Sequence, residues 1–242
     1  MIYLIIVQRI KILNKEHEDE KQVYAVEKQL YQLEQKALQL QMNPHFLFNA
    51  LNSIQGLILG NDINGAIHYL SKFSKLMRQT LSNSGGSLIP LQDELYALRL
   101  YLEIESFRFG DRFTFNIKVD PSIGEEFIEI PPMILQPYVE NAIIHGLLNK
   151  KSKGYLLIEL TKQGQHLHCL IQDNGIGRKR AMEIRAESGI ERKSKGMVIT
   201  SERLAILNRL SDDTYAVHVT DLFDENGNAS GTKVEVNIHL KK

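Results

Sequence analysis

The sequence is poor in several features that mark familiar classes of protein. Its 242 residues include one cysteine, Cys169, so no disulfide can form within the chain, which suits a reducing compartment. Basic and acidic residues number 29 each, so no net charge attracts nucleic acid, and we expect no direct nucleic-acid binding. Apolar residues make up 43% of the chain and charged residues 24%, which predicts that most of it folds.

Long apolar runs are also scarce at the start of the chain. The opening run, Met1–Val7, is far shorter than the ~20 residues that a helix needs to cross a bilayer, and it lacks the features of a secretory signal. It is either the inner end of a membrane helix that continues outside this chain or a short buried or interfacial segment. Arg9, Lys11 and Lys15 suit the cytoplasmic side of a membrane, which favours the first reading. We therefore expect a cytoplasmic chain at the inner face of the cell membrane, with possible attachment through its N-terminus.

Up to about residue 110 the apolar pattern is helical. From Val23 to Ile58 apolar residues recur in alternating steps of three and four, the heptad pattern of a coiled coil. A break at Gly60–Asp62 separates this seam from a second amphipathic run, Ile63–Leu81, and a third run covers Leu91–Phe107. Two such helical hairpins would bury the seam by pairing into a four-helix bundle, so we expect a homodimer.

After residue 110 the period changes from helical to alternating. Strands are predicted at Phe113–Val119, Tyr155–Leu160, Leu167–Asp173 and Thr232–Leu240, with helices at about Ile134–Leu148 and Thr200–Leu210. The expected fold class is α+β, in which an N-terminal helical coiled-coil and hairpin region precedes a two-layer α/β sandwich. The expected divisions are an apolar stub over residues 1–19, a helical region over 20–110 and a sandwich domain over 111–242.

The segment LQMNPHFLFNALNSI, which begins at Leu40, places Pro44 within the seam and His45 one residue off it. One reading is a simple helix kink beside an exposed histidine. The other is a histidine presented to a partner. Bulky Phe46 next to it, and Asn49 one helical turn further on, favour presentation. A neutral imidazole is a competent nucleophile at cellular pH.

Two motifs in the second half could hold a nucleotide. On the helix of IPPMILQPYVENAIIHG, Asn141 and His145 share a face, and a carboxamide oxygen suits Mg²⁺; the alternative is a helix with incidental polar groups. In LIQDNGIGRKR, Asp173 ends a strand and could accept a hydrogen bond from an exocyclic amine such as that of adenine. Gly175 and Gly177 would let the backbone approach a flat ligand, although D-N-G is also an ordinary turn.

Three further features surround these motifs. Bases outnumber acids from Arg178 to Lys195, which suits a mobile lid over a polyphosphate, or simply a solvated helix. Gly196 precedes a predicted helix start, a place that favours phosphate. A hairpin near the C-terminus turns at Asn226-Gly227 or at Ser230-Gly231, and Gly231-Thr232 could close one side of a pocket.

In this order, the motifs resemble the ATPase domain shared by histidine kinases, gyrase and Hsp90, the GHKL type. Upstream, NPHFLFNALNSI together with YLEIESFRFGDRF resembles the LytS/YehU-like sensor histidine kinases, and the likeness covers about residues 35–240.

The resemblance implies a dimeric sensor histidine kinase of a two-component system, which uses ATP and Mg²⁺ and passes phosphate to an aspartate of a response regulator. The residues it implies are His45 as phospho-acceptor with Asn49 beside it, Asn141 as the Mg²⁺ ligand with His145 on the same face, Asp173 on adenine, Gly175 and Gly177 around its slot, Gly196 by the phosphates, and Gly231 and Thr232 behind the pocket.

The chain departs from the family pattern at a few positions. Ile144 stands where the family often has a lysine, and Ile199 where asparagine is common. These keep open the alternative of a dimeric scaffold with a degenerate pocket. A GHKL-type ATPase without kinase activity is a further alternative. Such ATPases carry a glutamate at the position of Pro137, so the proline counts against this alternative. A lysine further along could replace the missing one: Lys150, Lys151 or Lys153.

Overall fold

The computed structural model describes residues 44–83, 88–110, 112–187 and 215–240, together with Arg9, Asn14, Lys15, His17, Lys21, Leu204 and Asn208. The chain divides into two compact units, Met1–Met42 and Asn43–Lys242. The described residues of the first unit are helical, whereas the apolar run Met1–Val7 and the seam before Pro44 lie outside the described residues. Within the part that the structure describes, no helix is long and apolar enough to span a membrane.

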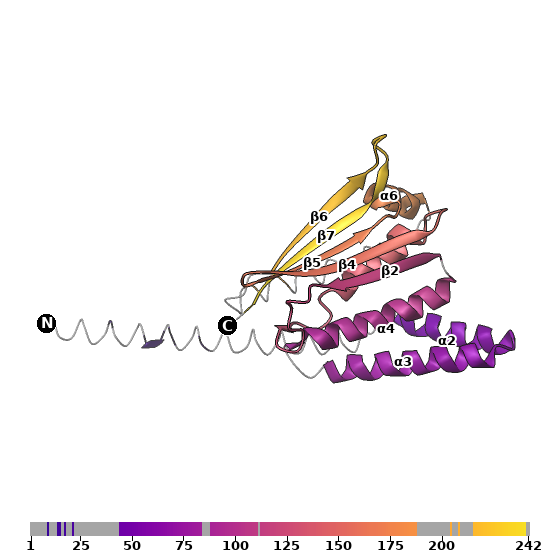
Figure 1. The fold of residues 1–242 in the computed structure, drawn as a ribbon, viewed down its shortest axis with the longest axis horizontal. Coiled ribbons are helices and arrows are strands. Elements are labelled where there is room, and N and C mark those ends of the chain that lie inside the picture. The colour runs from indigo at the N-terminus through magenta and orange to yellow at the C-terminus, as the bar shows by residue number, and fades with distance from the viewer. Residues whose placement is uncertain are drawn as a thin grey trace. The chain divides into compact units, whose positions relative to one another are not determined.

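The second unit begins with three helices, α2 (Pro44–Leu59), α3 (Ile63–Asn83) and α4 (Leu91–Phe109). The predicted break between the first two is confirmed: Asn61 has a φ of 61°, and the Asp62 carboxylate accepts a hydrogen bond from the backbone N–H of Gly65 at 2.9 Å. Figure 1 shows α4 between the α2–α3 hairpin and the sheet. The predicted domain division near residue 110 stays a prediction.

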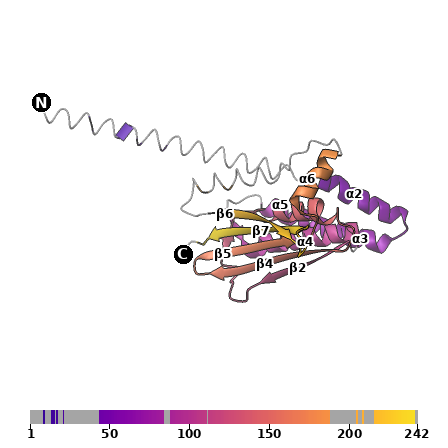
Figure 2. The ribbon, with the colours of Figure 1, turned by 90° about the horizontal axis from the view of Figure 1, so that it is seen from above.

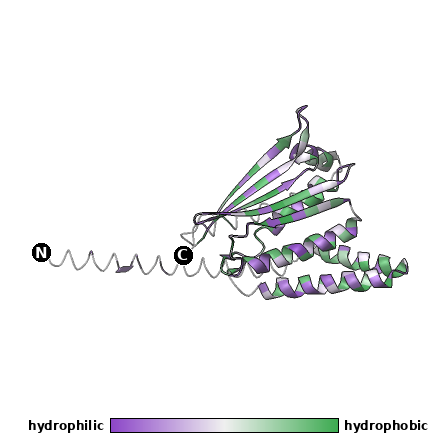
Figure 3. Cartoon of the chain, in the orientation of Figure 1, coloured by the Kyte–Doolittle hydropathy of each residue, from purple (hydrophilic) through white to green (hydrophobic). Residues whose placement is uncertain are grey.

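Helix α2 packs through a different row of residues from the predicted seam. Phe46 is 9% exposed, and its ring lies 6.1 Å from that of Phe73 and 5.4 Å from that of Tyr101, measured between centroids. By contrast, Leu51 and Ile58 of the seam are 55% and 51% exposed. Aromatic contacts with α3 and α4 therefore fix the helix within the chain and leave Leu51 and Ile58 of the seam exposed. Figure 3 shows that hydrophobic residues are frequent along this hairpin.

Within the described residues the sheet has five strands in the order β2-β4-β5-β7-β6, of which the β2–β4 pair alone is parallel. All four predicted strands are confirmed, and β6 is the first arm of the predicted C-terminal hairpin, for which the sequence analysis gave no bounds. The strands are β2 (Phe113–Val119), β4 (Gly154–Gln163), β5 (His166–Asp173), β6 (Tyr215–Phe223) and β7 (Ala229–His239). A separate two-residue pair, β1 (Ile89–Pro90) with β3 (Glu129–Ile130), was missed because it is too short to show a period.

Helices cover one face of this sheet, as Figures 1 and 2 show, which confirms the two-layer α+β class. They are α5 (Gln136–Asn141), the π-helix η1 (Ala142–Leu147) and α6 (Gly177–Glu187). Alternate residues of β4 are buried beneath them, as a strand with one covered face requires. Of the helix predicted at about Thr200–Leu210, only Leu204 and Asn208 are described, and both are helical.

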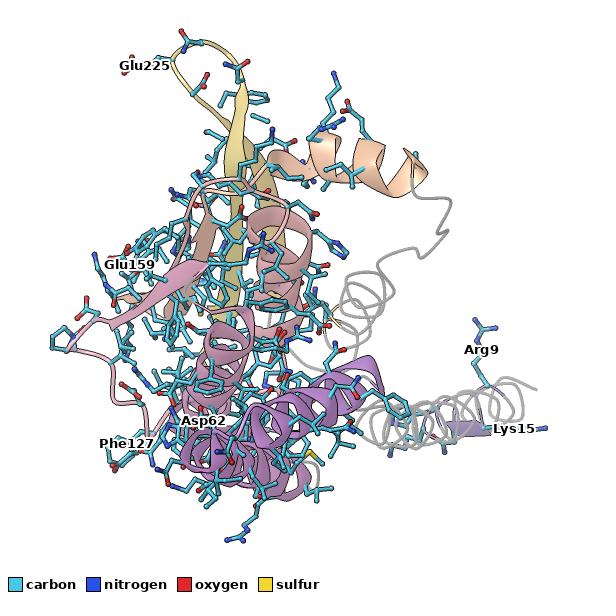
Figure 4. The ribbon with its side chains drawn as sticks, turned by 90° about the vertical axis from the view of Figure 1, so that its right-hand side faces the viewer. Arg9, Lys15, Asp62, Phe127, Glu159 and Glu225 are labelled. Atoms are coloured by element: carbon cyan, nitrogen blue, oxygen red, sulfur yellow. The ribbon has the colours of Figure 1, made fainter. Side chains whose placement is uncertain are left out.

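The hairpin between β6 and β7 turns at the first of the two predicted places. Gly227 has a φ of 78°, and its N–H donates to the Asp224 carbonyl at 2.9 Å. Figure 4 labels the neighbouring Glu225 at the tip of this turn. Gly231 lies instead within β7, opposite Leu222 and beside a register shift.

Candidate functional site

A cavity of about 130 Å³ lies between the helical layer and the carboxyl end of β5. Five predicted residues line it: Asn141, His145, Asp173, Gly177 and Thr232. The remaining lining residues are Tyr138, Ala142, Gly146, Ile171, Arg178, Ala181, Met182, Val219 and Val234. The cavity therefore has a mainly apolar wall with a few polar groups at fixed places, which is the usual make-up of a small-molecule site.

Asp173 is the central polar group of this site. Its side chain is 4% exposed, and its Oδ1 accepts a hydrogen bond from the Gly175 N–H at 2.8 Å. Burial raises the pKa of Asp173 from its ordinary 3.8 to about 6, while the N–H groups of Gly175 and Thr232 and the charge of Lys150 act in the opposite direction. At neutral pH the group remains mostly ionised, so it can accept a hydrogen bond from a bound amine.

Three glycines let the backbone close around Asp173. A Cβ on Gly175 would lie 2.4 Å from the carbonyl carbon of Gly146, and one on Gly146 would lie 2.9 Å from Asp173 Oδ1. A Cβ on Gly231, whose φ is 140°, would lie 2.0 Å from the Asp173 carbonyl oxygen. No side chain fits at Gly175 or Gly231 without backbone movement. Sequence reasoning missed Gly146 because its contact with Gly175 joins segments far apart in the chain.

Gly177 lies at the point where α6 begins. Its φ is 75°, and a Cβ there would lie 2.9 Å from the Cβ of Ala229. Glycine adopts this backbone region without the penalty that other residues incur.

The wall that carries Asn141 and His145 is partly a π-helix. The α-helical segment ends at Asn141, and the wider η1 turns follow, closed by a hydrogen bond from the Leu148 N–H to the Ile143 carbonyl at 3.0 Å. π-helical turns are rare and occur often at functional sites. Both predicted side chains nevertheless line the cavity.

The Asn141 carboxamide has a defined orientation. Its Nδ2 donates to the Pro137 carbonyl at 2.7 Å. The amide nitrogen thus points along the helix, and the oxygen is the atom that could ligate a cation. Within the described residues, no three His, Cys, Asp or Glu side chains gather in a way that could hold a metal ion. A Mg²⁺ ion here would need ligand phosphates to complete its shell.

Two cationic side chains flank the site. Lys150 Nζ donates to the Asn174 carbonyl at 2.6 Å, so of the three candidate lysines it lies against the D-N-G turn. On the other side, Arg178 Nε and Nη2 donate to the two carboxylate oxygens of Asp221, both at 2.7 Å. This pair raises the pKa of Arg178 and lowers that of Asp221. It also ties the first turn of α6 to β6, a strand whose bounds the sequence did not predict.

His45 is the second residue of α2, and its side chain is not among the described parts of the structure. Pro44 is the first described residue of this helix. Asn49 is half-buried, and its carbonyl accepts a hydrogen bond from Ser53 Oγ at 2.9 Å. The presentation of His45 therefore stays a prediction, as does the role of Gly196, which is not among the described residues.

Comparison with known proteins agrees with these motifs. Residues 33–113, which include His45 and Asn49, match the family model described as histidine kinase. The chain is 38% identical over 178 residues to the sensor protein LytS of Oceanobacillus iheyensis, covering 72% of this chain and 30% of that protein. It is 36% identical over 137 residues to the sensor histidine kinase YpdA of Escherichia coli, covering 57% and 24%. It is 35% identical over 156 residues to the sensor histidine kinase/phosphatase LytS of Staphylococcus aureus, covering 64% and 26%.

These matches make the chain a member of the histidine kinases. Within that class it is a relative of the LytS-type sensor proteins, as the motif around His45 predicted. It spans less than a third of the length of these curated relatives. Among solved structures, the catalytic domain of histidine kinase ThkA overlaps with a TM-score of 0.42 at 12% identity, over 63% of this chain and 94% of that one.

Proposed function

We propose that this chain is the kinase portion of a two-component sensor, which binds ATP in the cavity, phosphorylates His45 and passes the phosphoryl group to an aspartate of a response regulator. The observation that supports it best is Asp173, a buried carboxylate at a strand end that faces an apolar cavity and is framed by glycine backbone. The match to the histidine kinase family over the segment that contains His45 supports the second part of the proposal.

The cavity suits a purine ring. A flat apolar face can lie against Ile171, Val219 and Val234, while the exocyclic amine donates to Asp173. Gly146, Gly175 and Gly231 let the backbone pack closely around Asp173, which holds its carboxylate at this cavity.

The phosphates would extend toward Asn141, whose carboxamide oxygen would ligate Mg²⁺. Mg²⁺ neutralises the negative charge of the phosphates, and it normally keeps several waters, so a single protein ligand is enough to place it. We assign Gly196 and Gly231-Thr232 to the phosphate side and the back of the pocket, following the resemblance.

The transfer itself needs little from the protein beyond position and charge. A ring nitrogen of neutral His45 attacks the γ-phosphorus, the bond to the bridging oxygen of ADP breaks, and ADP leaves. In the second step an aspartate oxygen of the response regulator attacks the phosphorus and the P–N bond breaks. The chain's contribution to the first step is the rigid placement of α2, which Phe46 and Ala50 anchor by burial.

A second copy of the chain would cover the apolar side of the α2–α3 hairpin. This side continues the heptad seam, whose parallel pairing leads toward a four-helix bundle. Its exposed residues are Phe48, Leu51, Ile58, Leu59, Ile63, Ile67, Leu70 and Leu81. A homodimer therefore belongs to the proposal, as does a position at the cytoplasmic face of the membrane.

One observation counts against a simple ATPase of the same fold. Pro137 occupies the position from which a glutamate of such an enzyme would activate water. Its carbonyl oxygen accepts a hydrogen bond from Asn141 Nδ2. A scaffold that lacks nucleotide binding remains the alternative that the experiment must separate.

The test is incubation of the purified chain with Mg-ATP, followed by addition of a receiver domain. The proposal predicts label on the chain that then moves to the receiver. Asn141→Asp puts a carboxylate beside the phosphates and should abolish labelling without unfolding the chain. ATP hydrolysis with no label would indicate the ATPase, and no binding of ATP by calorimetry would indicate the scaffold.

A further inference from the structure

Glu94, near the start of α4, is a buried acid whose partners lie about 40 residues further along the chain. Its side chain is 3% exposed. Oε2 accepts a hydrogen bond from the Met133 N–H at 2.8 Å, and Oε1 accepts one from the Leu135 N–H at 3.2 Å. Both carboxylate oxygens thus hold the backbone immediately before the helix that carries Asn141.

The start of α5 has no side-chain cap of its own. Leu135 occupies the N-cap position of α5, and its side chain makes no capping hydrogen bond. The first N–H groups of a helix have no partner within the helix, and an acid near them is favourable. Met133 has a φ of 56°, a region that non-glycine residues adopt only when their surroundings hold them there.

The direction of α5 and η1 decides where the nucleotide-site residues lie. Asn141, His145 and Gly146 all follow the held segment within this continuous helical stretch. Because the entry point is fixed by a side chain of α4, a shift at Glu94 moves one whole wall of the cavity. Misplacement of reacting groups by about 1 Å can cost on the order of 100-fold in rate.

Helix α4 also supports the phospho-acceptor helix. Tyr101 packs against Phe46, the residue next to His45, and Glu103 pairs with Lys72 of α3 at 2.8 Å. Glu94 and Tyr101 are seven residues apart on one helix, roughly 10 Å along its axis. One rigid element therefore contacts both the helix that begins at Pro44 and the helix that forms the cavity wall.

We propose that Glu94 is a positioning residue of the ATP site, which fixes helix α5 to the helical module that carries His45. The inference rests on the proposed function of the cavity. It assigns to α4 the task of keeping the two reacting parts in a common frame.

The test uses Glu94→Gln in the whole chain, with Asp93→Asn as the control. Glutamine keeps one acceptor oxygen but presents an NH₂ group to the other backbone N–H, so one hydrogen bond is lost at similar size. We expect the Kd of a non-hydrolysable Mg-ATP analogue and the KM for ATP to rise ~10-fold, the loss of one charge-assisted bond. The maximal rate of labelling should fall much less. Asp93 lies in the same turn and is half-buried, and its variant should bind like the parent.

A merely structural role would lower the amount of active protein and the melting temperature while leaving the KM for ATP unchanged, and that result would overturn the proposal. Amide hydrogen exchange gives a second readout without nucleotide: the Met133 and Leu135 amides should exchange faster in Glu94→Gln than in Asp93→Asn. If Glu94→Gln does not fold, Glu94→Asp, which keeps the charge but is shorter, is measured in the same way. An unmodified chain that fails to bind ATP would contradict the proposed function, whereas the exchange measurement would still decide whether Glu94 holds α5.

Discussion

Replacing Asp173 with asparagine should stabilise the nucleotide-free protein at neutral pH and, at the same time, weaken ATP binding. The carboxylate is buried among apolar groups, and burial raises its pKa from 3.8 to about 6. The folded state thus binds the Asp173 proton more tightly than the unfolded state does. The ionised carboxylate therefore lowers the stability of the folded state, while it offers a charged acceptor to a bound amine.

The size of the effect follows from linkage between protonation and folding. A pKa that rises from 3.8 to about 6 costs ~3 kcal/mol of folding free energy when the group is ionised, at about 1.36 kcal/mol per unit. Below the unfolded-state pKa the group is protonated in both states, and no cost arises. The cost grows as the pH rises from about 4 through about 6 and is constant above roughly pH 7.

The assay is urea unfolding of the parent and Asp173→Asn at several pH values between 4 and 7.5. The variant should be more stable by up to ~3 kcal/mol at pH 7 and about equal at pH 4. Asp224→Asn is the matched control, and its change in stability should have the opposite sign. The N–H groups of Asn228 and Asn226 lower the pKa of Asp224 in the exposed hairpin turn, so its ionised form stabilises the folded state. A variant at position 173 that is less stable than the parent at pH 7, or a stability difference that does not change with pH, would refute this reasoning.

Two further perturbations test the packing of the site and the assembly. Gly175→Ala should lower the free energy of unfolding by ~1–3 kcal/mol and remove ATP binding, because its Cβ would meet the backbone of Gly146. The control is Gly56→Ala, whose Cβ has open space, and this variant should be neutral or slightly stabilising in urea unfolding. Replacing both Leu47 and Leu51 with glutamate should convert dimers into monomers in sedimentation, while residues 111–242 stay folded. A parent chain that is monomeric at tens of micromolar, roughly the range in which weak interfaces populate, would contradict the proposed dimer.

Local sequence signals predicted most of the fold. The alternation at Phe113–Val119 matches β2 residue for residue, and the Gly60–Asp62 break lies between α2 and α3 as expected. Turn chemistry also placed Asp173 and Gly177 at the cavity, since the end of an apolar strand followed by glycine is a local feature.

Contacts between distant segments could not be predicted in this way. Nothing near Glu94 in sequence indicates that its carboxylate binds the amides of Met133 and Leu135. The pairing of Arg178 with Asp221 needed β6, and the close approach of Gly146 to Gly175 needed the sheet and helix to be packed. In each case the partner is fixed by tertiary structure and not by residue spacing.

The packing face of α2 illustrates a competition between two local patterns. The heptad count selected the row of Leu51 and Ile58, but Phe46 and Ala50 are the residues buried within the chain. Phe46 is buried because the rings of Phe73 on α3 and Tyr101 on α4 lie within contact distance of its own ring. Leu51 and Ile58 remain exposed within the chain, and the proposed dimer contact rests on them.

Labelling of the purified chain with Mg-ATP carrying a radioactive γ-phosphate, compared with His45→Gln, tests the central proposal most directly. The proposal predicts a phosphoryl group on the parent that is stable in base and lost in acid, as a phosphoramidate should be. It predicts no label on His45→Gln, with ATP binding unchanged by calorimetry. Undiminished acid-labile labelling of His45→Gln, or a parent chain that binds Mg-ATP and acquires no label, would contradict it.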